Sequence, residues 1–213
     1  MTRPENINRP EFVIASGNAG KLKEFQQLFS ATDIRICPQS EFDVPEAIED
    51  GLSFIENAII KARNAAHYTG LAAIADDSGL EVDALNGAPG IYSARFNEDA
   101  NGVRTSDEAN NEKLLSLLKG KPESERKASF VCALAFMRHE KDPSPVVCVA
   151  RWDGVILPEP QGSNGFGYDP LFYLPEYSCA SAELDRDVKN RISHRGQALQ
   201  LLLAQLNKLG LMS

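Results

Sequence analysis

The chain has 213 residues, of which 43% are hydrophobic and 24% charged, and its formal net charge is −8. This composition is that of an ordinary globular protein, and the acidic balance argues against stable nucleic-acid binding, which requires a basic face. No apolar run approaches the roughly 20 residues of a membrane-spanning helix, and the polar N-terminal residues do not resemble a secretory signal. We therefore expect a cytoplasmic protein without membrane contact, with one domain over residues 1–213 and residues 1–11 as a flexible extension.

The first predicted elements are a strand, a turn and a helix. Residues 12–15 form an apolar run that is too short for a helix and suits a buried strand. After a turn containing two glycines, Lys21 opens a pattern in which Leu22, Phe25 and Phe29 share one helix face. Unpaired N–H groups and the helix dipole at such a start can hold an anion, although the glycine spacing is not that of a P-loop. A plain strand-to-helix connection is the alternative.

The next predicted elements are a second strand, a longer helix and a third strand. Residues 34–37 alternate like a strand, and Ser53 with Glu56 forms a capping box for a helix that ends near Tyr68. Residues 71–75 are apolar and are expected to form a strand that ends at the acidic pair following it. Alternation of strands and helices in this half of the chain favours an α/β fold.

The segment Asp76-Asp77-Ser78-Gly79 follows that strand, so both carboxylates are predicted at a strand end, where α/β proteins bind ligands. Two adjacent acids in a buried position repel each other and lose solvation unless a cation offsets them. Mg²⁺ prefers carboxylate oxygens, so we predict a divalent metal site here. An ordinary acidic turn is the alternative. A second acidic patch either is a solvated loop or completes the metal site: Glu46, Glu49 and Asp50.

The second half of the chain combines helices with hairpins. Thr105 and Glu108 predict a capping box before a leucine-rich helix. Residues 128–137 and 146–152 are expected to form two long strands around a polar turn. Asp153-Gly154 predicts a second hairpin turn. Together these elements indicate a mixed, partly antiparallel sheet.

Two further segments have ligand-binding features. Residues 162–170 place three glycines around two aromatic residues, so the backbone can approach a ligand and an aromatic ring can stack on a base. A last helix is predicted from Ser193, with Lys189, His194 and Arg195 near its start. Cations at a helix N-terminus suit phosphate, and Arg195, which can only donate hydrogen bonds, could favour a purine with a 6-oxo group. Core packing of the aromatics and of His194 is the alternative.

Six blocks closely resemble the inosine triphosphate pyrophosphatase family. They occur in the family's order at residues 15–21, 51–58, 75–80, 87–95, 165–170 and 192–198. The resemblance implies an α/β fold in which a long mixed β-sheet with flanking helices forms two lobes around a central active-site cleft. It also implies a homodimer that uses Mg²⁺ to hydrolyse purine nucleoside triphosphates such as ITP, dITP and XTP to the monophosphate and pyrophosphate. Such hydrolysis keeps deaminated purines out of DNA and RNA.

The resemblance also implies roles for single residues. It makes Asp77 the acceptor that activates water, and Glu49 with Asp77 the metal ligands. A pyrophosphatase of broader or pyrimidine preference, or a nucleotide sensor that does not cleave, are competing hypotheses. Two departures from the family pattern are Asn164, where a glycine is usual, and Asp187-Val188, where an acidic pair is more common. The residues that resemble substrate contacts are Ser16, Gly17, Asn18, Ala19, Gly20, Lys21, Lys61, Ser78, Phe166, Gly167, Tyr168, Asp169, Lys189, His194 and Arg195.

Overall fold

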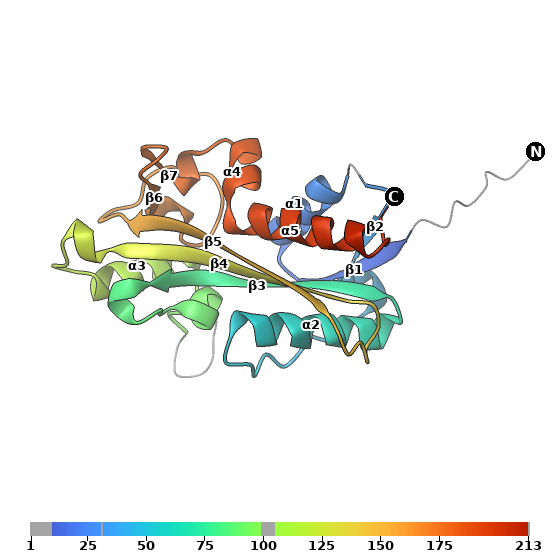
Figure 1. The fold of residues 1–213 in the computed structure, drawn as a ribbon. Coiled ribbons are helices and arrows are strands. Elements are labelled where there is room, and N and C mark those ends of the chain that lie inside the picture. Colours follow the sequence, from blue (N-terminus) through green and yellow to red (C-terminus); the bar gives the residue numbers. More distant parts are fainter. Residues whose placement is uncertain (1–9, 31, 99–104, 213) are drawn as a thin grey trace, which may run out of the picture.

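The computed structural model describes residues 10–30, 32–98 and 105–212, without the side chain of Leu28. In these ranges seven strands form one sheet in the order β2-β1-β3-β4-β5-β6-β7 (Figure 1). The strands are β1 (Glu11–Ala15), β2 (Arg35–Pro38), β3 (Ala72–Val82), β4 (Lys127–Met137), β5 (Val146–Ile156), β6 (Phe172–Leu174) and β7 (Cys179–Ala180). The α-helices are α1 (Ala19–Phe29), α2 (Phe54–Thr69), α3 (Asp107–Leu117), α4 (Arg186–Ile192) and α5 (His194–Lys208). Within the described ranges, none of these helices has the length and apolar character needed to cross a membrane.

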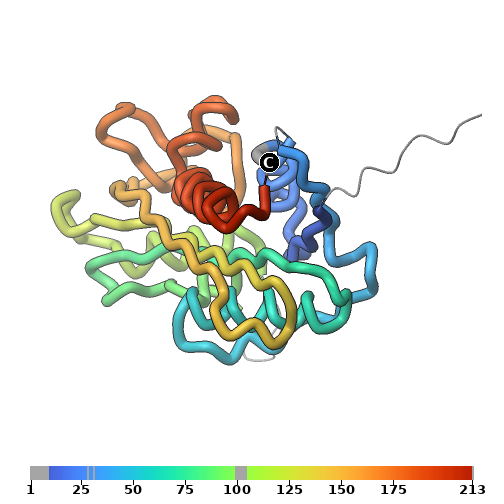
Figure 2. Tube along the Cα trace, turned by 45° about the vertical axis from the view of Figure 1, so that its right-hand side comes forward, coloured from blue at the N-terminus to red at the C-terminus, as the bar shows by residue number. Residues whose placement is uncertain are grey.

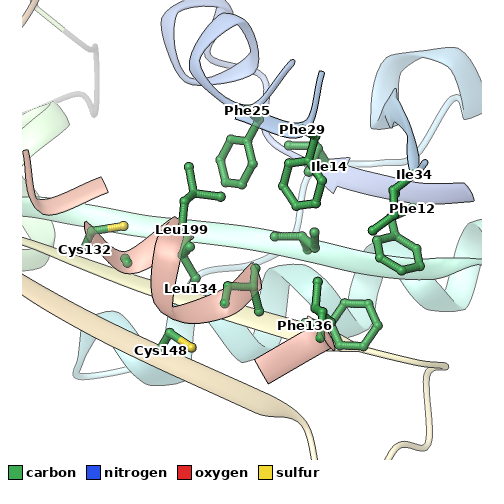
Figure 3. Packing of buried hydrophobic residues seen from close by; sticks show 14 of the residues in the cluster. Phe12, Ile14, Phe25, Phe29, Ile34, Cys132, Leu134, Phe136, Cys148 and Leu199 are labelled. Carbon is green, nitrogen blue, oxygen red and sulfur yellow. The ribbon is translucent and has the colours of Figure 1, made fainter. Parts of the chain in front are cut away.

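Helices cover both faces of the sheet. Figure 1 shows α1 and α5 on one face and α2 on the other. Side chains alternate between these faces along β3, so Ile74 packs in the core with α1 and α5 while Ala75 packs in the core with α2. Figure 3 shows the first of these cores, where Phe25 of α1 and Leu199 of α5 meet over the strands. The C-terminal end of α5 lies beside α1 (Figure 2).

A third core lies at the other half of the sheet. It contains Leu80 from the second half of β3, Leu114 of α3, Trp152 of β5 and Phe172 of β6. β1 pairs in parallel with β2 and β3, whereas β3 to β7 pair in antiparallel fashion. Each half of the molecule therefore has its own buried apolar side chains, and one sheet joins the halves. The predicted α/β fold with a long mixed sheet and flanking helices is confirmed.

The prediction that the third strand ends at the acidic pair is wrong. β3 continues through Asp76 and Asp77 to Val82, because this stretch pairs residue by residue with β4. Its neighbour β1 ends earlier, where Ala15 lies opposite Ala75. The turn-forming composition of this segment yields to the long antiparallel ladder with β4, since strand preference depends on packing and pairing more than on residue type. The acidic pair thus follows directly after the end of the parallel pairing.

The predicted hairpin turn at Asp153-Gly154 is also wrong, because β5 runs through both residues. A Cβ atom on Gly154 would lie 2.6 Å from the carbonyl oxygen of Tyr173 and 2.7 Å from the Phe172 ring. This glycine therefore allows β6 to approach β5 closely. A glycine inside a strand often marks such a close approach of another backbone.

Several element boundaries differ from the predicted ones. The N-cap of α3 is Ser106, whose side chain accepts from the Ala109 N–H, and the predicted cap at Thr105 lies one residue earlier. β1 begins at Glu11, which the prediction placed in the N-terminal extension, and residues 1–9 of that prediction lie outside the described ranges. The unpredicted elements β6, β7 and α4 have 3, 2 and 7 residues, too few to establish a hydrophobic period.

The predicted polar turn between β4 and β5 is confirmed, and Asp142 organises it. Its carboxylate is 3% exposed and accepts from Arg138 Nε at 2.8 Å and from the backbone N–H groups of Arg138 and Ser144 at 3.0 Å each. The hydrogen bonds from Arg138 hold the pKa of Asp142 well below its usual range. The ionised carboxylate therefore stabilises this hairpin.

We expect Asp142→Ala to lower the free energy of unfolding by about 1–3 kcal/mol, because several donors lose their buried acceptor. Urea denaturation at pH 7 measures this. The contribution is complete above the unfolded-state pKa near ~3.9 and is lost as the pH falls through the lower folded-state value. The difference from wild type should therefore narrow strongly near pH 2. Lys141→Ala, at an exposed position in the same turn, is the control and should change stability by less than about 0.5 kcal/mol.

Candidate active site

The adjacent carboxylates Asp76 and Asp77 point to opposite faces of the sheet. Asp76 contacts Lys21 of α1 and Arg195 of α5, whereas Asp77 contacts Lys61 of α2. This follows from the two-residue period of a strand. The predicted mutual repulsion of the pair is thereby reduced, and each carboxylate has its own cation from a different helix. Three of the predicted site residues, Lys21, Lys61 and Arg195, nevertheless meet at the stretch of β3 just beyond the end of β1.

Asp76 is a fully buried anion with four side-chain donors. Lys21 Nζ and Ser78 Oγ donate to Oδ1, the latter at 2.8 Å, while Arg195 Nε donates to Oδ2 at 2.8 Å and Cys132 Sγ at 3.2 Å. Burial alone would raise the pKa of Asp76, but the charges of Arg195 and Lys21 hold it well below its usual range. Asp76 therefore remains ionised and anchors both cations.

Asp77 is less well compensated. Lys61 Nζ donates to its Oδ1 at 2.7 Å and also to Glu49 Oε2 at 3.1 Å. The other oxygen, Oδ2, is buried and has no hydrogen-bond partner among the described residues. Burial raises the pKa of Asp77, although the charge of Lys61 opposes this shift. A buried carboxylate oxygen without a partner is costly, and here it is available to a ligand or to water.

The loop between β1 and α1 forms a helix N-terminus beside Asp76. Asn18 is the N-cap of α1, with its side-chain oxygen accepting from the Lys21 N–H at 3.0 Å, and Ser16 Oγ accepts from the Asn18 N–H at 3.2 Å. α1 therefore starts at Ala19, two residues before the predicted start. A Cβ on Gly17 would meet no atom within 4 Å, so that backbone is open to an approaching group. Helix N–H groups and Lys21 together suit a phosphate.

The 162–170 loop meets the first loop at Phe166. A Cβ atom on Gly20 would lie 3.1 Å from the Phe166 ring, which is 38% exposed. Lys189 Nζ lies 5.5 Å from the centroid of this ring. Asp169 is buried and holds this arrangement, since its carboxylate accepts from the Phe166 N–H at 2.9 Å and from Lys189 Nζ. An exposed ring edged by cations is placed to stack on a base.

Tyr168 and His194, both predicted substrate contacts, lie in the core. The Tyr168 hydroxyl donates to the carbonyl oxygen of Ser93 at 2.9 Å, and its ring is 4% exposed. His194 stacks on Phe130 with centroids 4.8 Å apart, and burial lowers the pKa of its imidazole well below the usual value. The structure thus gives both side chains a packing role, and direct contact with substrate stays a prediction.

Two residues beside the site were not predicted from the sequence. Glu24 accepts from Arg195 Nη1 at 2.6 Å, and Cys132 donates to Asp76. The position of Glu24 three residues after Lys21 places both on one face of α1, a spacing that could have identified it. Nothing in the local sequence of β4 distinguishes Cys132 from a core residue. Asn164 is also explained: its side chain donates to the carbonyl oxygen of Leu184 at 3.3 Å.

A magnesium ion fits the carboxylates of this site. In the ranges that the structure describes, no group of three or more His, Cys, Asp and Glu side chains forms a metal-binding cluster. Mg²⁺ in enzymes acting on phosphates is typically held by one or two carboxylates and by the substrate's own phosphates, so a larger protein cluster is not required. Glu49 and Asp77 converge on Lys61, and Asp77 Oδ2 has no partner among the described residues. The carboxylates of Glu49 and Asp77 therefore suit an ion whose coordination is completed by a polyphosphate.

The protein is of the α/β class, and cations from α1, α2, α4 and α5 converge on its buried carboxylates, as expected of a site for a polyphosphate. Residues 12–205 match the sequence profile of the Ham1 family, and the chain belongs to this family. It is 57% identical to a dITP/XTP pyrophosphatase of Vibrio parahaemolyticus over 197 residues, 92% of this chain and 96% of that protein. It is 55% identical to a dITP/XTP pyrophosphatase of Shigella flexneri over 194 residues, 91% of this chain and 96% of that protein.

Solved structures agree with this assignment. A HAM1 protein from Coxiella burnetii is 49% identical, with a TM-score of 0.86 over 93% of this chain and 99% of that one. The Staphylococcus aureus Ham1 protein is 43% identical, with a TM-score of 0.81 over 93% of this chain and 98% of that one. The resemblance inferred from the six sequence blocks is therefore confirmed.

Proposed function

We propose that this protein is a dITP/XTP pyrophosphatase that hydrolyses deaminated purine nucleoside triphosphates to the monophosphate and pyrophosphate. The observation that carries this proposal is the half-exposed Phe166 ring beside Lys189 and Arg195, with Arg195 paired to Asp76, the residue next to Asp77. The cations hold the phosphates, the ring stacks on the base, and a buried carboxylate takes up a proton. The enzyme removes ITP, dITP and XTP from the cytoplasmic nucleotide pool, and we propose that it acts as a homodimer.

In the proposed mechanism, Asp77 orients the attacking water and accepts its proton. Its pKa, raised by burial, makes it a stronger base than an exposed aspartate. Lys21, Lys61 and the N-terminus of α1 bind the phosphate oxygens, and Lys61 exchanges a carboxylate partner for a phosphate one. Glu49 and Asp77 would hold Mg²⁺, which would supply positive charge to offset the negative charge that develops on the phosphates. Ionised Asp76 keeps Lys21 in place throughout.

Selectivity is proposed to depend on Arg195. Its guanidinium donates to Asp76, Glu24 and Ser78, using three of its five N–H groups. Each terminal nitrogen keeps one N–H that can donate to a 6-oxo group. Adenine offers a 6-amino donor instead and would leave these N–H groups without an acceptor. Losses of this kind can reach about 10⁴-fold.

Pyrophosphate release from a panel of nucleotides tests the proposed function. With Mg²⁺, we expect kcat/KM for ITP, dITP and XTP to exceed that for ATP by at least about 10²-fold, because the buried donors of Arg195 lose their acceptor when a 6-amino group replaces the 6-oxo group. GTP has the same 6-oxo group and differs from ITP by its 2-amino group, so discrimination against GTP is not assigned to Arg195. With a chelator, release should stop for all substrates. Equal efficiency on ATP would refute the selectivity assigned to Arg195, equal efficiency on GTP would refute the preference for deaminated purines, and faster release from pyrimidine nucleotides would favour the broader pyrophosphatase. Tight nucleotide binding without any release would instead indicate a sensor.

A further inference from the structure

One residue of the 162–170 loop is held at both of its backbone groups by α3. The Gly167 N–H donates to Asp107 Oδ2 at 2.6 Å, and Asn111 Nδ2 donates to the Gly167 carbonyl oxygen at 3.0 Å. Asp107 and Asn111 are four residues apart, so they project from the same face of the helix. An acceptor and a donor on neighbouring turns thus match the N–H and C=O of a single residue. α3 lies at the same end of the sheet as β6 and β7 (Figure 1).

Gly167 is one of three glycines of this loop with a positive φ, and it lies directly between Phe166 and Tyr168. Its φ of +62° lies in the left-handed region, which favours glycine because other residues are strained there. On its C-terminal side Tyr168 is fixed in the core by its hydrogen bond to Ser93. On its N-terminal side Phe166 extends to Gly20 and the cations. The conformation of Gly167 therefore sets where the Phe166 ring points relative to the anchored part of the loop.

The side chains of Asp107 and Asn111 both hydrogen-bond to this loop. Asn111 is 9% exposed, and within the described ranges its one side-chain hydrogen bond goes to Gly167. Burying an amide is unfavourable unless it is hydrogen-bonded, and the bond to Gly167 satisfies Nδ2, whereas Oδ1 is buried without a partner among the described residues. The contact with Gly167 is therefore the one identified role of this polar side chain. Asp107 lies in the first turn of α3, where the helix dipole favours its negative charge.

We propose that Asp107 and Asn111 are positioning residues that set the affinity and selectivity for the purine base by fixing the direction of Phe166. This inference rests on the proposed function, since it assigns Phe166 to stacking on the base. Neither residue touches the cations that hold the phosphates. Their loss is therefore expected to weaken recognition of the base while leaving recognition of the phosphates unchanged. Asp169 holds the Phe166 N–H from the inner side of the loop, so the loop stays folded without the α3 contacts.

The test compares Asp107→Ala and Asn111→Leu with wild type, using ITP and inorganic triphosphate, which lacks the base. We expect KM for ITP to rise about tenfold to a hundredfold, as removal of a charge-assisted hydrogen bond allows, with kcat changed by less than about threefold. The ratio of kcat/KM for ITP over ATP should fall. The inhibition constant of inorganic triphosphate should stay at the wild-type value. Asp107→Asn retains an acceptor and should recover most of the loss.

Glu112→Ala is the matched control, because Glu112 is exposed on the same helix and makes no described contact with the loop. It should behave as wild type. An equal loss of affinity for ITP and inorganic triphosphate would show a general structural effect and overturn the inference, as would an unchanged KM for ITP in both variants. Failure of wild type to hydrolyse ITP would overturn the proposed function itself, so the two failures are distinguishable.

Discussion

Replacing Asp77 with asparagine is expected to lower kcat on ITP by about 10³- to 10⁴-fold, because the amide can neither accept the proton of the attacking water nor supply a charged metal ligand. The stability of this variant is expected to equal or exceed that of wild type. Burial raises the pKa of Asp77, so the folded state disfavours its charged form. Lys61 keeps Glu49 as a partner in the variant. A neutral side chain of the same shape therefore relieves an unfavourable charge.

Pyrophosphate release and urea denaturation, measured on the same preparation, test this pair of expectations. Asp83→Asn is the control, since Asp83 follows β3 directly and is exposed. It should keep wild-type activity and stability. Turnover by Asp77→Asn within about tenfold of wild type would remove Asp77 from the mechanism. A large drop in its stability would show instead that Asp77 is a structural ion-pair partner.

Asp76→Asn is expected to have the opposite profile, with the free energy of unfolding reduced by about 3–5 kcal/mol. The variant leaves Arg195 and Lys21 without their shared buried anion. Because these two cations donate to different oxygens of Asp76, the NH₂ group of the new amide would point at one of them. Because the pKa of Asp76 is held well below its usual range, its contribution is complete above the unfolded-state value. The loss should therefore be fully present at pH 7 and should shrink only in strong acid.

A double variant tests whether the loss at Asp76 has this electrostatic cause. Arg195→Met removes the buried cation that Asp76→Asn strands, so the double variant should be more stable than the sum of the single changes allows. A coupling energy above about 1 kcal/mol is expected for groups in direct contact. Strict additivity would show that Asp76 stabilises the protein by packing alone. Neither variant should hydrolyse ITP efficiently, since Lys21 and Arg195 serve the substrate in the proposed mechanism.

Local sequence patterns predicted the elements that have a clear hydrophobic period. The helices with Phe25 and Leu199 and the long β4–β5 hairpin follow from spacing alone. The prediction of a turn at Asp153-Gly154 was wrong because the same dipeptide also occurs inside a strand where a glycine lets a neighbouring strand approach closely. The extension of β3 through Asp77 could not be predicted for a related reason: its cause is the pairing with β4, more than fifty residues later in the chain.

The site was predicted in its residues but not in its geometry. The motif blocks contain Lys21 and Arg195, and the family resemblance added Lys61, which lies outside them. The opposite orientation of the two carboxylates emerged only because β3 continues as a strand. Neither Glu24 nor the α3 residues lie in a block, because their roles depend on contacts between helices and loops distant in sequence. Chemistry that depends on residue type is readable from sequence, whereas positioning depends on tertiary packing.

The alternation of Asp76 and Asp77 also limits how this protein can evolve. Inserting or deleting one residue in β3 before the pair would exchange the two environments. Asp76 would then point towards α2, and Asp77 towards α1 and α5. Both carboxylates would still be present in the sequence, and both would be in the wrong place. Length changes in this lineage should therefore accumulate in the connections outside β3, while the number of residues between Ala72 and Asp77 stays fixed.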